Sequence, residues 1–282
     1  MYRVALIYDF DGTLSPGNMQ QHTLIPALGF DDGSGFWNEV KKRNRDVDGD
    51  EILAYMHYLL EANPGVVSAS SLRRHGSELP LFGGVDEWFD RINAFGANRS
   101  LDIEHYIISS GLREMIEGSS ISENFKHIFA SRYAYTGDTP KWPAVAINYT
   151  TKTQYLFRIN KGIDNNWDDA SVNSYIPMQE RPLPFERMIF LGDGGTDIPT
   201  MKMIKYQGGT AIAVFDEAEF RGPHQKKVYK LIAEDRANYV CPADYNNGSL
   251  LDITIKGVLG RIARATGYVP GRKARENPRV FE

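Results

Sequence analysis

The chain has 282 residues, 42% of them hydrophobic, which is enough for one large domain with an insertion or for two modest domains. The formal net charge of -4 and the pI near 5.9 argue against nucleic acid as the main partner, and the basic run at 272–275 is too short to change this. The single cysteine, Cys241, excludes an internal disulfide framework and favours a reducing compartment. No apolar run approaches the ~20 residues of a membrane span, and the first strand-like run follows Met1 almost at once, so we expect no signal peptide, no membrane partner and a cytoplasmic location.

Strand-like and helix-like segments alternate along most of the chain. Apolar runs predict strands at residues 3–8, 104–109, 127–135, 144–149, 187–191, 209–215 and 237–241. Helical patterns lie at residues 85–96, 111–118, 152–161, 196–206, 223–235 and 249–265. Residues 162–184 are rich in Asn, Asp and Pro and lack periodicity, so we expect a surface excursion there. The alternation predicts an α/β fold, a Rossmann-like parallel sheet with helices on both faces.

The long interval between the first two strands breaks this alternation. Residues 15–81 contain helical patterns at 36–42 and 50–61 but no convincing strand, and the interval is too long for a loop. We therefore predict an α/β core formed by residues 1–14 and 82–282. The interval itself is predicted to be a helical cap inserted after the first strand.

The first strand ends abruptly in two carboxylates. Asp9 and Asp11 follow the apolar run 4–8, and Gly12 comes directly after them and lets the backbone turn. In open α/β sheets, ligands bind at the carboxyl ends of the strands. One carboxylate there could attack an electrophile while the other handles a proton. Taken alone, the segment is equally compatible with a strand that ends in an ordinary Asp-Gly turn.

Two further segments carry groups that suit an anion. Ser109 and Ser110 follow the second predicted strand, where hydroxyl and backbone donors facing a helix start suit a phosphate. Capping of the following helix is the competing interpretation of Ser109. Lys152 lies at a helix start, where the helix dipole does not favour a cation, so it is placed to meet an anion. Lys161 is the competing lysine, and we favour Lys152 because its position faces the strand ends.

A glycine-rich turn after the strand at 187–191 carries two more carboxylates, Asp193 and Asp197. Together with Asp9, they make an oxygen-ligand site for a hard cation. At this point the sequence resembles the haloacid dehalogenase superfamily of phosphotransferases, in the branch that is similar to phosphoserine phosphatase. The resemblance runs from residue 4 to about residue 215 and is carried by residues 9–13, residues 107–111, Lys152 and residues 192–197.

The resemblance implies a role for each carboxylate. Asp9 would be the nucleophile that forms an aspartyl-phosphate. Asp11 would protonate the leaving alcohol and then deprotonate the water that hydrolyses the intermediate. Mg²⁺ would be bound by Asp9, the backbone carbonyl of Asp11 and Asp193, and Asp197 would orient this shell.

The remaining motif residues would bind the phosphate. Ser109 and the amide of Ser110 would hold phosphate oxygens, and Lys152 would balance the charge of the nucleophile and the phosphoryl group. The implied function is a Mg²⁺-dependent phosphatase that hydrolyses a small phosphomonoester. Two alternatives stay open: a phosphotransferase or phosphomutase that uses the same residues, and a catalytically idle binding module with this fold.

We expect the substrate to be a small phosphorylated metabolite that is admitted when the cap opens. Selectivity is expected in the cap, at Asn18, Met19, Gln20 and residues 37–45. Glu39 and Arg43 are candidates for recognising charged groups of phosphoserine. The basic run at 41–45 is also typical of a solvated helix face. Three aromatic residues are predicted to form the core of the cap: Trp37, Tyr55 and Tyr58.

Overall fold

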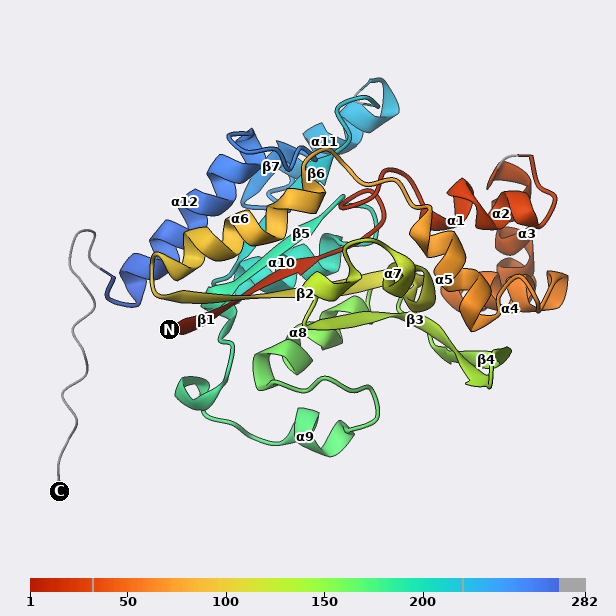
Figure 1. The fold of residues 1–282 in the computed structure, drawn as a ribbon, viewed down its shortest axis with the longest axis horizontal. Coiled ribbons are helices and arrows are strands. Elements are labelled where there is room, and N and C mark those ends of the chain that lie inside the picture. The colour runs from red at the N-terminus through yellow and green to blue at the C-terminus, as the bar shows by residue number, and fades with distance from the viewer. Residues whose placement is uncertain (32, 220, 269–282) are drawn as a thin grey trace.

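The computed structural model describes residues 1–31, 33–219 and 221–268, and the basic run at 272–275 lies outside them. Within this part of the chain the strands form one seven-stranded sheet in the order β4-β3-β2-β1-β5-β6-β7 (Figure 1). The strands are β1 Tyr2–Tyr8, β2 Leu101–Leu112, β3 His127–Thr136, β4 Thr139–Val145, β5 Met188–Gly192, β6 Thr210–Phe215 and β7 Tyr239–Pro242.

Helices connect most of these strands. After the predicted cap segment come α6 Val85–Ala97, α7 Arg113–Gly118, α8 Lys152–Lys161, α9 Asp169–Asn173, α10 Ile198–Tyr206, α11 Pro223–Ala233 and α12 Leu250–Ala265. Within the predicted cap segment lie α1 Met19–His22, α2 Leu24–Ala27, α3 Gly33–Asp46, α4 Glu51–Ala62 and α5 Ala69–Ser77.

The prediction of a strand at 144–149 is wrong, because the strand in this region is β4 at Thr139–Val145. The chain turns at Gly137, whose φ is 58°, and β4 then runs antiparallel to β3 as an edge strand. Beyond β4 the chain leaves the sheet, and the backbone N–H of Ile147 donates to Oγ of Ser131 at 3.0 Å. All other strand pairs in the sheet are parallel, so the predicted α/β fold with a mostly parallel sheet is confirmed.

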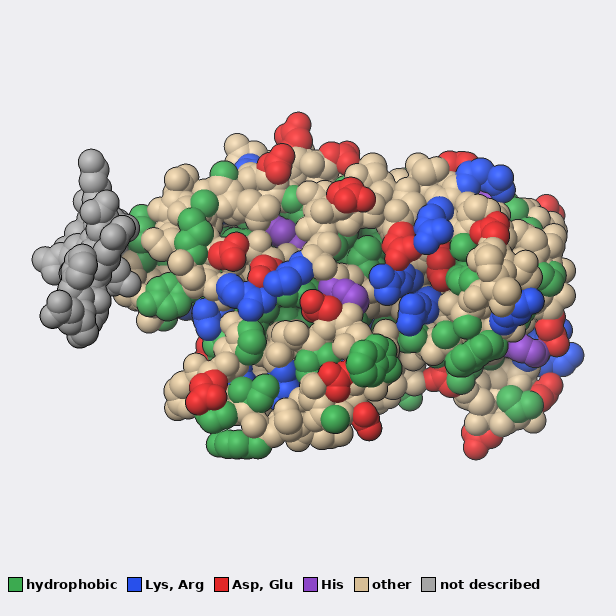
Figure 2. Space-filling model, turned by 60° about the horizontal axis from the view of Figure 1, so that its bottom comes forward, with side chains coloured by type: hydrophobic (Ala, Val, Ile, Leu, Met, Phe, Trp, Pro, Cys, Tyr) green, Lys and Arg blue, Asp and Glu red, His purple; other side chains and the backbone are tan. Residues whose placement is uncertain are grey.

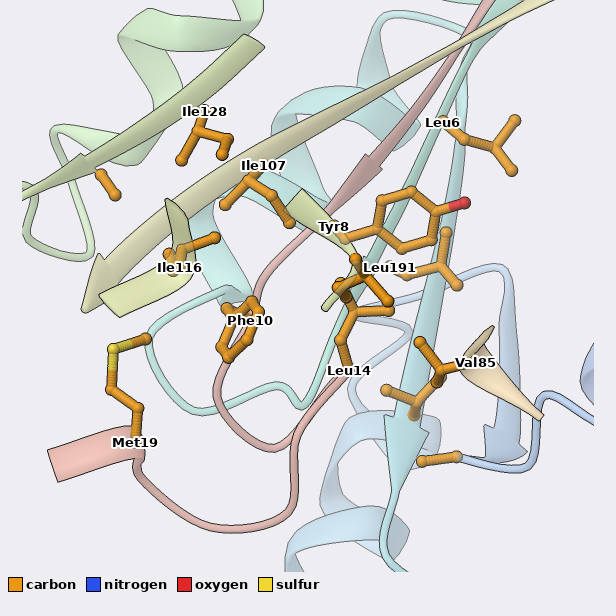
Figure 3. Packing of buried hydrophobic residues seen from close by; sticks show 14 of the residues in the cluster. Leu6, Tyr8, Phe10, Leu14, Met19, Val85, Ile107, Ile116, Ile128 and Leu191 are labelled. Carbon is orange, nitrogen blue, oxygen red and sulfur yellow. The ribbon is translucent and has the colours of Figure 1, made fainter. Parts of the chain in front are cut away.

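Helices cover both faces of the sheet because successive residues of a strand point to opposite sides. Val4, Leu6 and Tyr8 of β1 belong to the buried cluster that includes residues of α6 and α12, part of which is seen in Figure 3. Ala5 and Ile7 belong to a second cluster with residues of α8 and α10. Burial on both faces explains why the sequence of β1 is almost continuously apolar.

The centre of the sheet creates a crevice for a ligand. β1 pairs with β2 on one side and with β5 on the other, and the chain builds the sheet outward in both directions from β1. In such sheets the crevice lies at the carboxyl ends of the two strands where the direction reverses. Asp9 follows β1 and Asp193 follows β5, so both carboxylates lie at this crevice.

The segment 15–81 forms a helical unit at one end of the molecule (Figure 1). The two residues that flank this segment are joined by a hydrogen bond, since the backbone N–H of Phe82 donates to the carbonyl of Leu14 at 2.9 Å. The β3–β4 hairpin holds the unit from the side, since the Tyr133 hydroxyl donates to the carbonyl of Met56 at 2.6 Å. The helices predicted at 36–42 and 50–61 are present as α3 and α4, while the division into two domains stays a prediction.

The surface carries charges of both signs. On the face shown in Figure 2, basic and acidic side chains lie side by side. Arg3 and Glu104, for example, form an ion pair at 2.7 Å, in which the two charges neutralise each other. The predicted excursion at 162–184 lies on the surface, where Trp167 and Tyr175 are exposed. Among the described helices, none combines the length and hydropathy needed to cross a membrane.

Candidate active site

The strand end after β1 holds the Asp9 side chain in a buried position. The backbone N–H of Asp9 donates to the carbonyl of Leu191 at 2.9 Å, which continues the β1–β5 ladder by one residue. One carboxylate oxygen of Asp9, Oδ1, accepts the N–H of Phe10 at 2.7 Å. Burial raises the pKa of Asp9, and the charge of Lys152 partly offsets this effect. Asp9 is therefore fixed in place, with an electrostatic partner that favours its charged form.

The turn after Asp9 brings Asp11 back toward the crevice. Oδ1 of Asp11 accepts the backbone N–H of Met19 at 2.8 Å. Burial raises the pKa of Asp11 to about 7, although the bond from Met19 opposes the shift. Gly12 has a φ of 67°, and a Cβ there would lie 3.0 Å from Cβ of Asp193. Glycine at this position thus permits both the turn and the close approach of the two acidic turns.

Lys152 joins two of the carboxylates. Its Nζ donates to Oδ2 of Asp9 at 2.8 Å and to Oδ1 of Asp197 at 2.7 Å, and its side chain is completely buried. Burial alone would lower the pKa of Lys152, but the charges of Asp197 and Asp9 outweigh it and raise the pKa. Lys161, the competing lysine, instead donates to the carbonyl of Ser174 at 2.6 Å. The structure therefore brings Lys152, and not Lys161, to the carboxylates.

Three carboxylates form a cluster that could hold a metal ion. Asp9, Asp193 and Asp197 each offer one oxygen, and these oxygens lie within 4.8 Å of one another. Burial and the charge of Asp9 raise the pKa of Asp197. Its Oδ2 atom is buried and finds no hydrogen-bond partner among the described residues. A Cβ at Gly192 would lie 2.3 Å from that oxygen, so glycine lets Asp197 fold back over β5. An all-oxygen donor set fits a hard divalent cation, and the unsatisfied oxygen of Asp197 could accept a hydrogen bond from a water molecule bound to that cation.

The serines lie at the end of β2 against the same crevice. Ser109 is fully buried, and its Oγ accepts the N–H of Gly111 at 3.0 Å. The N-cap residue of α7 is Leu112, without a side-chain cap, so the competing interpretation of Ser109 as a helix cap is wrong. The Oγ of Ser110 is buried and has no hydrogen-bond partner among the described residues. A hydroxyl in this state is suited to donate to a ligand.

A cavity of about 640 Å³ opens above these residues. Its lining includes Asp9, Asp11, Ser109, Ser110 and Asp193. A volume of this order suits a small-molecule ligand.

The predicted cap segment forms one wall of the cavity. Of the residues predicted to set selectivity, Asn18, Gln20, Trp37 and Lys41 line the cavity. The side chain of Met19 does not, because it is fully buried; a Cβ at Gly111 would lie 2.2 Å from its Cε.

Glu39 and Arg43 are not among the residues that line the cavity. Arg43 pairs with Glu39 at 3.0 Å and with Glu61, and its guanidinium lies 4.3 Å from the ring centre of Tyr58. Glu39 and Arg43 are therefore paired with each other, and neither side chain lines the cavity in which a substrate would bind. Of the basic residues in the run 41–45, only Lys41 lines the cavity.

Three features of the site were not predicted from the sequence. The Tyr55 hydroxyl donates to the carbonyl of Ser110 at 2.9 Å, so a residue predicted only as cap core also contacts the end of β2. Lys227 of α11 lines the opposite wall, and its Nζ donates to Oδ2 of Asp193 at 2.7 Å. Asp216 lines the same wall and could have been found, because it directly follows the strand predicted at 209–215.

The fold is similar to those of haloacid dehalogenase hydrolases. A hydrolase of that family from Salmonella enterica serovar Typhi has a TM-score of 0.53 and 15% identity, covering 89% of this chain and 69% of its own. A substrate-bound phosphoserine phosphatase has a TM-score of 0.53 and 15% identity, covering 90% and 98%. A probable phosphoserine phosphatase from Vibrio cholerae has a TM-score of 0.56 and 14% identity, covering 94% and 67%.

Sequence comparison adds a relative without a described activity. An uncharacterized protein of Borreliella burgdorferi is 28% identical over 280 residues, which covers 88% of this chain and 93% of that protein. No protein-family model matches the chain. The solved structures confirm that the fold of this chain resembles those of a haloacid dehalogenase hydrolase and of phosphoserine phosphatases.

Proposed function

We propose that this protein is a Mg²⁺-dependent phosphatase that hydrolyses a small phosphomonoester through an aspartyl-phosphate at Asp9. The observation that carries the proposal is the buried contact between Asp9 and Lys152, 2.8 Å long, at the crevice between β1 and β5. A buried ion pair often stabilises a fold no more than packed apolar residues of similar volume would, so stability alone does not account for this pair. A charged pair at the ligand crevice of an α/β sheet is therefore best explained by chemistry.

The first chemical step is the attack of Asp9 on phosphorus. An anionic nucleophile and an anionic phosphate repel each other, so the site must neutralise charge while it aligns the reacting atoms. Lys152 supplies one positive charge next to Asp9. The hydroxyl of Ser110, which is buried and unpaired among the described residues, would donate to a phosphate oxygen, together with Ser109. A bond forms between Asp9 and phosphorus, and the ester bond to the alcohol oxygen breaks.

Asp11 would move the proton in both steps. Burial raises the pKa of Asp11, which helps it to hold a proton for the leaving alcohol, and the carboxylate left after that transfer can accept a proton from the attacking water. The bond from the N–H of Met19 keeps the Asp11 carboxyl directed toward the cavity during both steps. Hydrolysis then releases phosphate and restores the Asp9 carboxylate.

The carboxylate cluster would hold the cation. Asp9, Asp193 and the backbone carbonyl of Asp11 would be its protein ligands, and Asp197, held by Lys152, would orient them. When bound, Mg²⁺ would supply positive charge that offsets the repulsion between the phosphate and the carboxylates.

The segment 15–81 would act as a cap that selects the substrate. It provides one whole wall of the cavity, and the volume of about 640 Å³ suits a small phosphorylated metabolite and not a folded phosphoprotein. On this wall, Gln20 and Lys41 offer polar contacts and Trp37 offers an aromatic surface. The hydrogen bonds to the β3–β4 hairpin suggest that closure involves local movement at the mouth and not a free swing of the whole segment.

A screen of small phosphorylated metabolites tests the proposal. Release of inorganic phosphate should require both Mg²⁺ and Asp9, so EDTA and Asp9→Asn should each abolish it, and added Mg²⁺ should restore only the EDTA-treated protein. Product analysis separates hydrolysis from transfer, because a phosphotransferase or mutase would yield a phosphorylated acceptor. Turnover that persists in Asp9→Asn would show that the nucleophile is wrongly assigned.

A further inference from the structure

One cation of the site comes from outside the four sequence motifs. Lys227 lies on α11, and its Nζ donates to Oδ2 of Asp193 at 2.7 Å. The other oxygen, Oδ1, accepts the N–H of Gly195 at 3.1 Å. Asp193 is a member of the carboxylate cluster that fits a divalent cation. Lys227 therefore makes an ion pair with the carboxylate of Asp193, which the metal would need as a ligand.

The position of Lys227 follows from close packing of the glycine-rich turn against α11. A Cβ at Gly194 would lie 2.6 Å from Cδ1 of Leu231, so only glycine lets the turn approach the helix this closely. Lys227 precedes Leu231 by four residues and so lies on the same face of α11, one turn away. The contact between Gly194 and Leu231 thus directs the ammonium group toward Asp193.

The two lysines that contact the carboxylate cluster, Lys152 and Lys227, differ in how firmly they are held. Lys152 is completely buried and contacts both Asp9 and Asp197. Lys227 is 42% exposed and contacts Asp193. An ion pair of this exposure is weak and can exchange its partners at little cost, whereas a buried pair cannot. Lys152 is therefore a permanent part of the site, and Lys227 is a replaceable one.

We propose that Lys227 competes with the divalent cation for Asp193 and so sets the metal affinity of the site. The inference rests on the proposed function, because it takes Asp193 as a metal ligand. A cation that binds Asp193 must either displace the ammonium group or share the carboxylate with it. In the second case the two positive charges lie a few ångströms apart and repel each other. Both cases weaken metal binding relative to a site without Lys227.

The opposite role makes the opposite prediction. If Lys227 served only to orient Asp193 for the metal, then removal of its charge would weaken metal binding. Lys227→Met removes the charge and keeps a side chain of similar length, and Lys227→Arg keeps the charge. Lys226→Met is the matched control, because Lys226 is the preceding residue of α11, is exposed, and carries the same charge.

Calorimetric titration of the full chain with MgCl₂, without substrate, measures the effect directly. Lys227→Met should bind Mg²⁺ about three- to fivefold more tightly than the wild type, as expected for loss of a weak competing ion pair. Lys227→Arg and Lys226→Met should both bind within about twofold of the wild type. Unchanged or weaker binding in Lys227→Met would overturn the inference, and so would an equal gain in Lys226→Met, which would be an effect of net charge alone.

Asp193→Asn separates failure of this inference from failure of the proposed function. It should abolish Mg²⁺ binding. If the wild type bound no Mg²⁺, or if Asp193→Asn bound it as the wild type does, the proposed metal site and the inference would both be wrong. If Asp193→Asn lost binding while Lys227→Met gained none, the inference alone would fail.

Discussion

The hydroxyl of Tyr55 donates a hydrogen bond to the backbone carbonyl of Ser110 at 2.9 Å. Tyr55 belongs to α4 of the predicted cap segment, and Ser110 belongs to the irregular end of β2, which is proposed to bind phosphate. This bond couples α4 to the end of β2, since any displacement of α4 would leave the Ser110 carbonyl without this donor.

The first prediction concerns this bond. Tyr55→Phe keeps the ring but leaves the Ser110 carbonyl without its donor, which costs roughly 1–3 kcal/mol for a buried acceptor. We expect a loss of about five- to fiftyfold in kcat/KM with p-nitrophenyl phosphate. Tyr58→Phe is the control, because Tyr58 lies on the same helix but its ring packs on Phe36 and Arg43. Similar kinetics for both variants would contradict a coupling role for Tyr55.

The second prediction concerns Lys152. Lys152→Met leaves the buried carboxylates of Asp9 and Asp197 without their partner, and breaking a buried pair costs about 3–5 kcal/mol. Protonated carboxyls need no such partner, so the loss of unfolding free energy should be larger at pH 8 than at pH 5. Urea unfolding at the two pH values measures this difference. Phosphatase activity should be lost as well, whereas Lys161→Met, outside the carboxylate cluster, should remain active.

The third prediction concerns catalysis by Asp11. Asp11→Asn should slow both formation and breakdown of the phospho-enzyme, each by about 10²–10⁴, which is typical of lost proton transfer. Esters of acidic phenols need little protonation on leaving, so their formation step should suffer less than that of alkyl phosphates. Rapid-quench kinetics with the two classes of ester measures the difference. Equal losses for both classes would count against Asp11 as the acid.

The fourth prediction concerns stability and pH in the absence of metal. Burial raises the pKa of Asp11 from 3.8 to about 7. A raised carboxyl pKa stabilises the fold below pH 3.8, and that contribution is lost as the pH rises to about 7. Asp11→Asn remains neutral throughout, so its gain in unfolding free energy over the wild type should grow from about pH 4 to pH 7 and then level off. Urea unfolding in EDTA tests this, and a gain that is the same at pH 4 and pH 8 would contradict it.

Site residues at the ends of strands were predictable from the sequence because the pattern that marks a strand end involves only neighbouring residues. Asp9, Ser109 and Asp193 each stand at the point where an apolar run gives way to a glycine-containing turn. Parallel strands bring such points to one edge of the sheet, so three separate local patterns predicted one site. The site contacts of Lys152 also follow from a local feature, its position at a helix start.

Other features depend on packing between distant segments and left no local signal. Lys227 reaches Asp193 only because Gly194 lets the turn approach Leu231, and nothing in the sequence near Lys227 indicates this. The edge strand β4 was missed for a different reason. Its residues Pro140 and Pro143 argue against a strand in the interior of a sheet but are tolerated at an edge. The neighbouring run at 144–149 is more apolar and was therefore predicted as the strand instead.

Trapping of the covalent intermediate tests the central claim most directly. The protein would be mixed with ³²P-labelled p-nitrophenyl phosphate and Mg²⁺, quenched in acid within a single turnover, and digested for peptide mapping. We predict an acid-stable, hydroxylamine-sensitive label on the peptide that contains Asp9, absent from Asp9→Asn and accumulating in Asp11→Asn if breakdown slows more than formation. Label on another residue, or hydrolysis by Asp9→Asn at the wild-type rate, would contradict the assignment of Asp9 as the nucleophile.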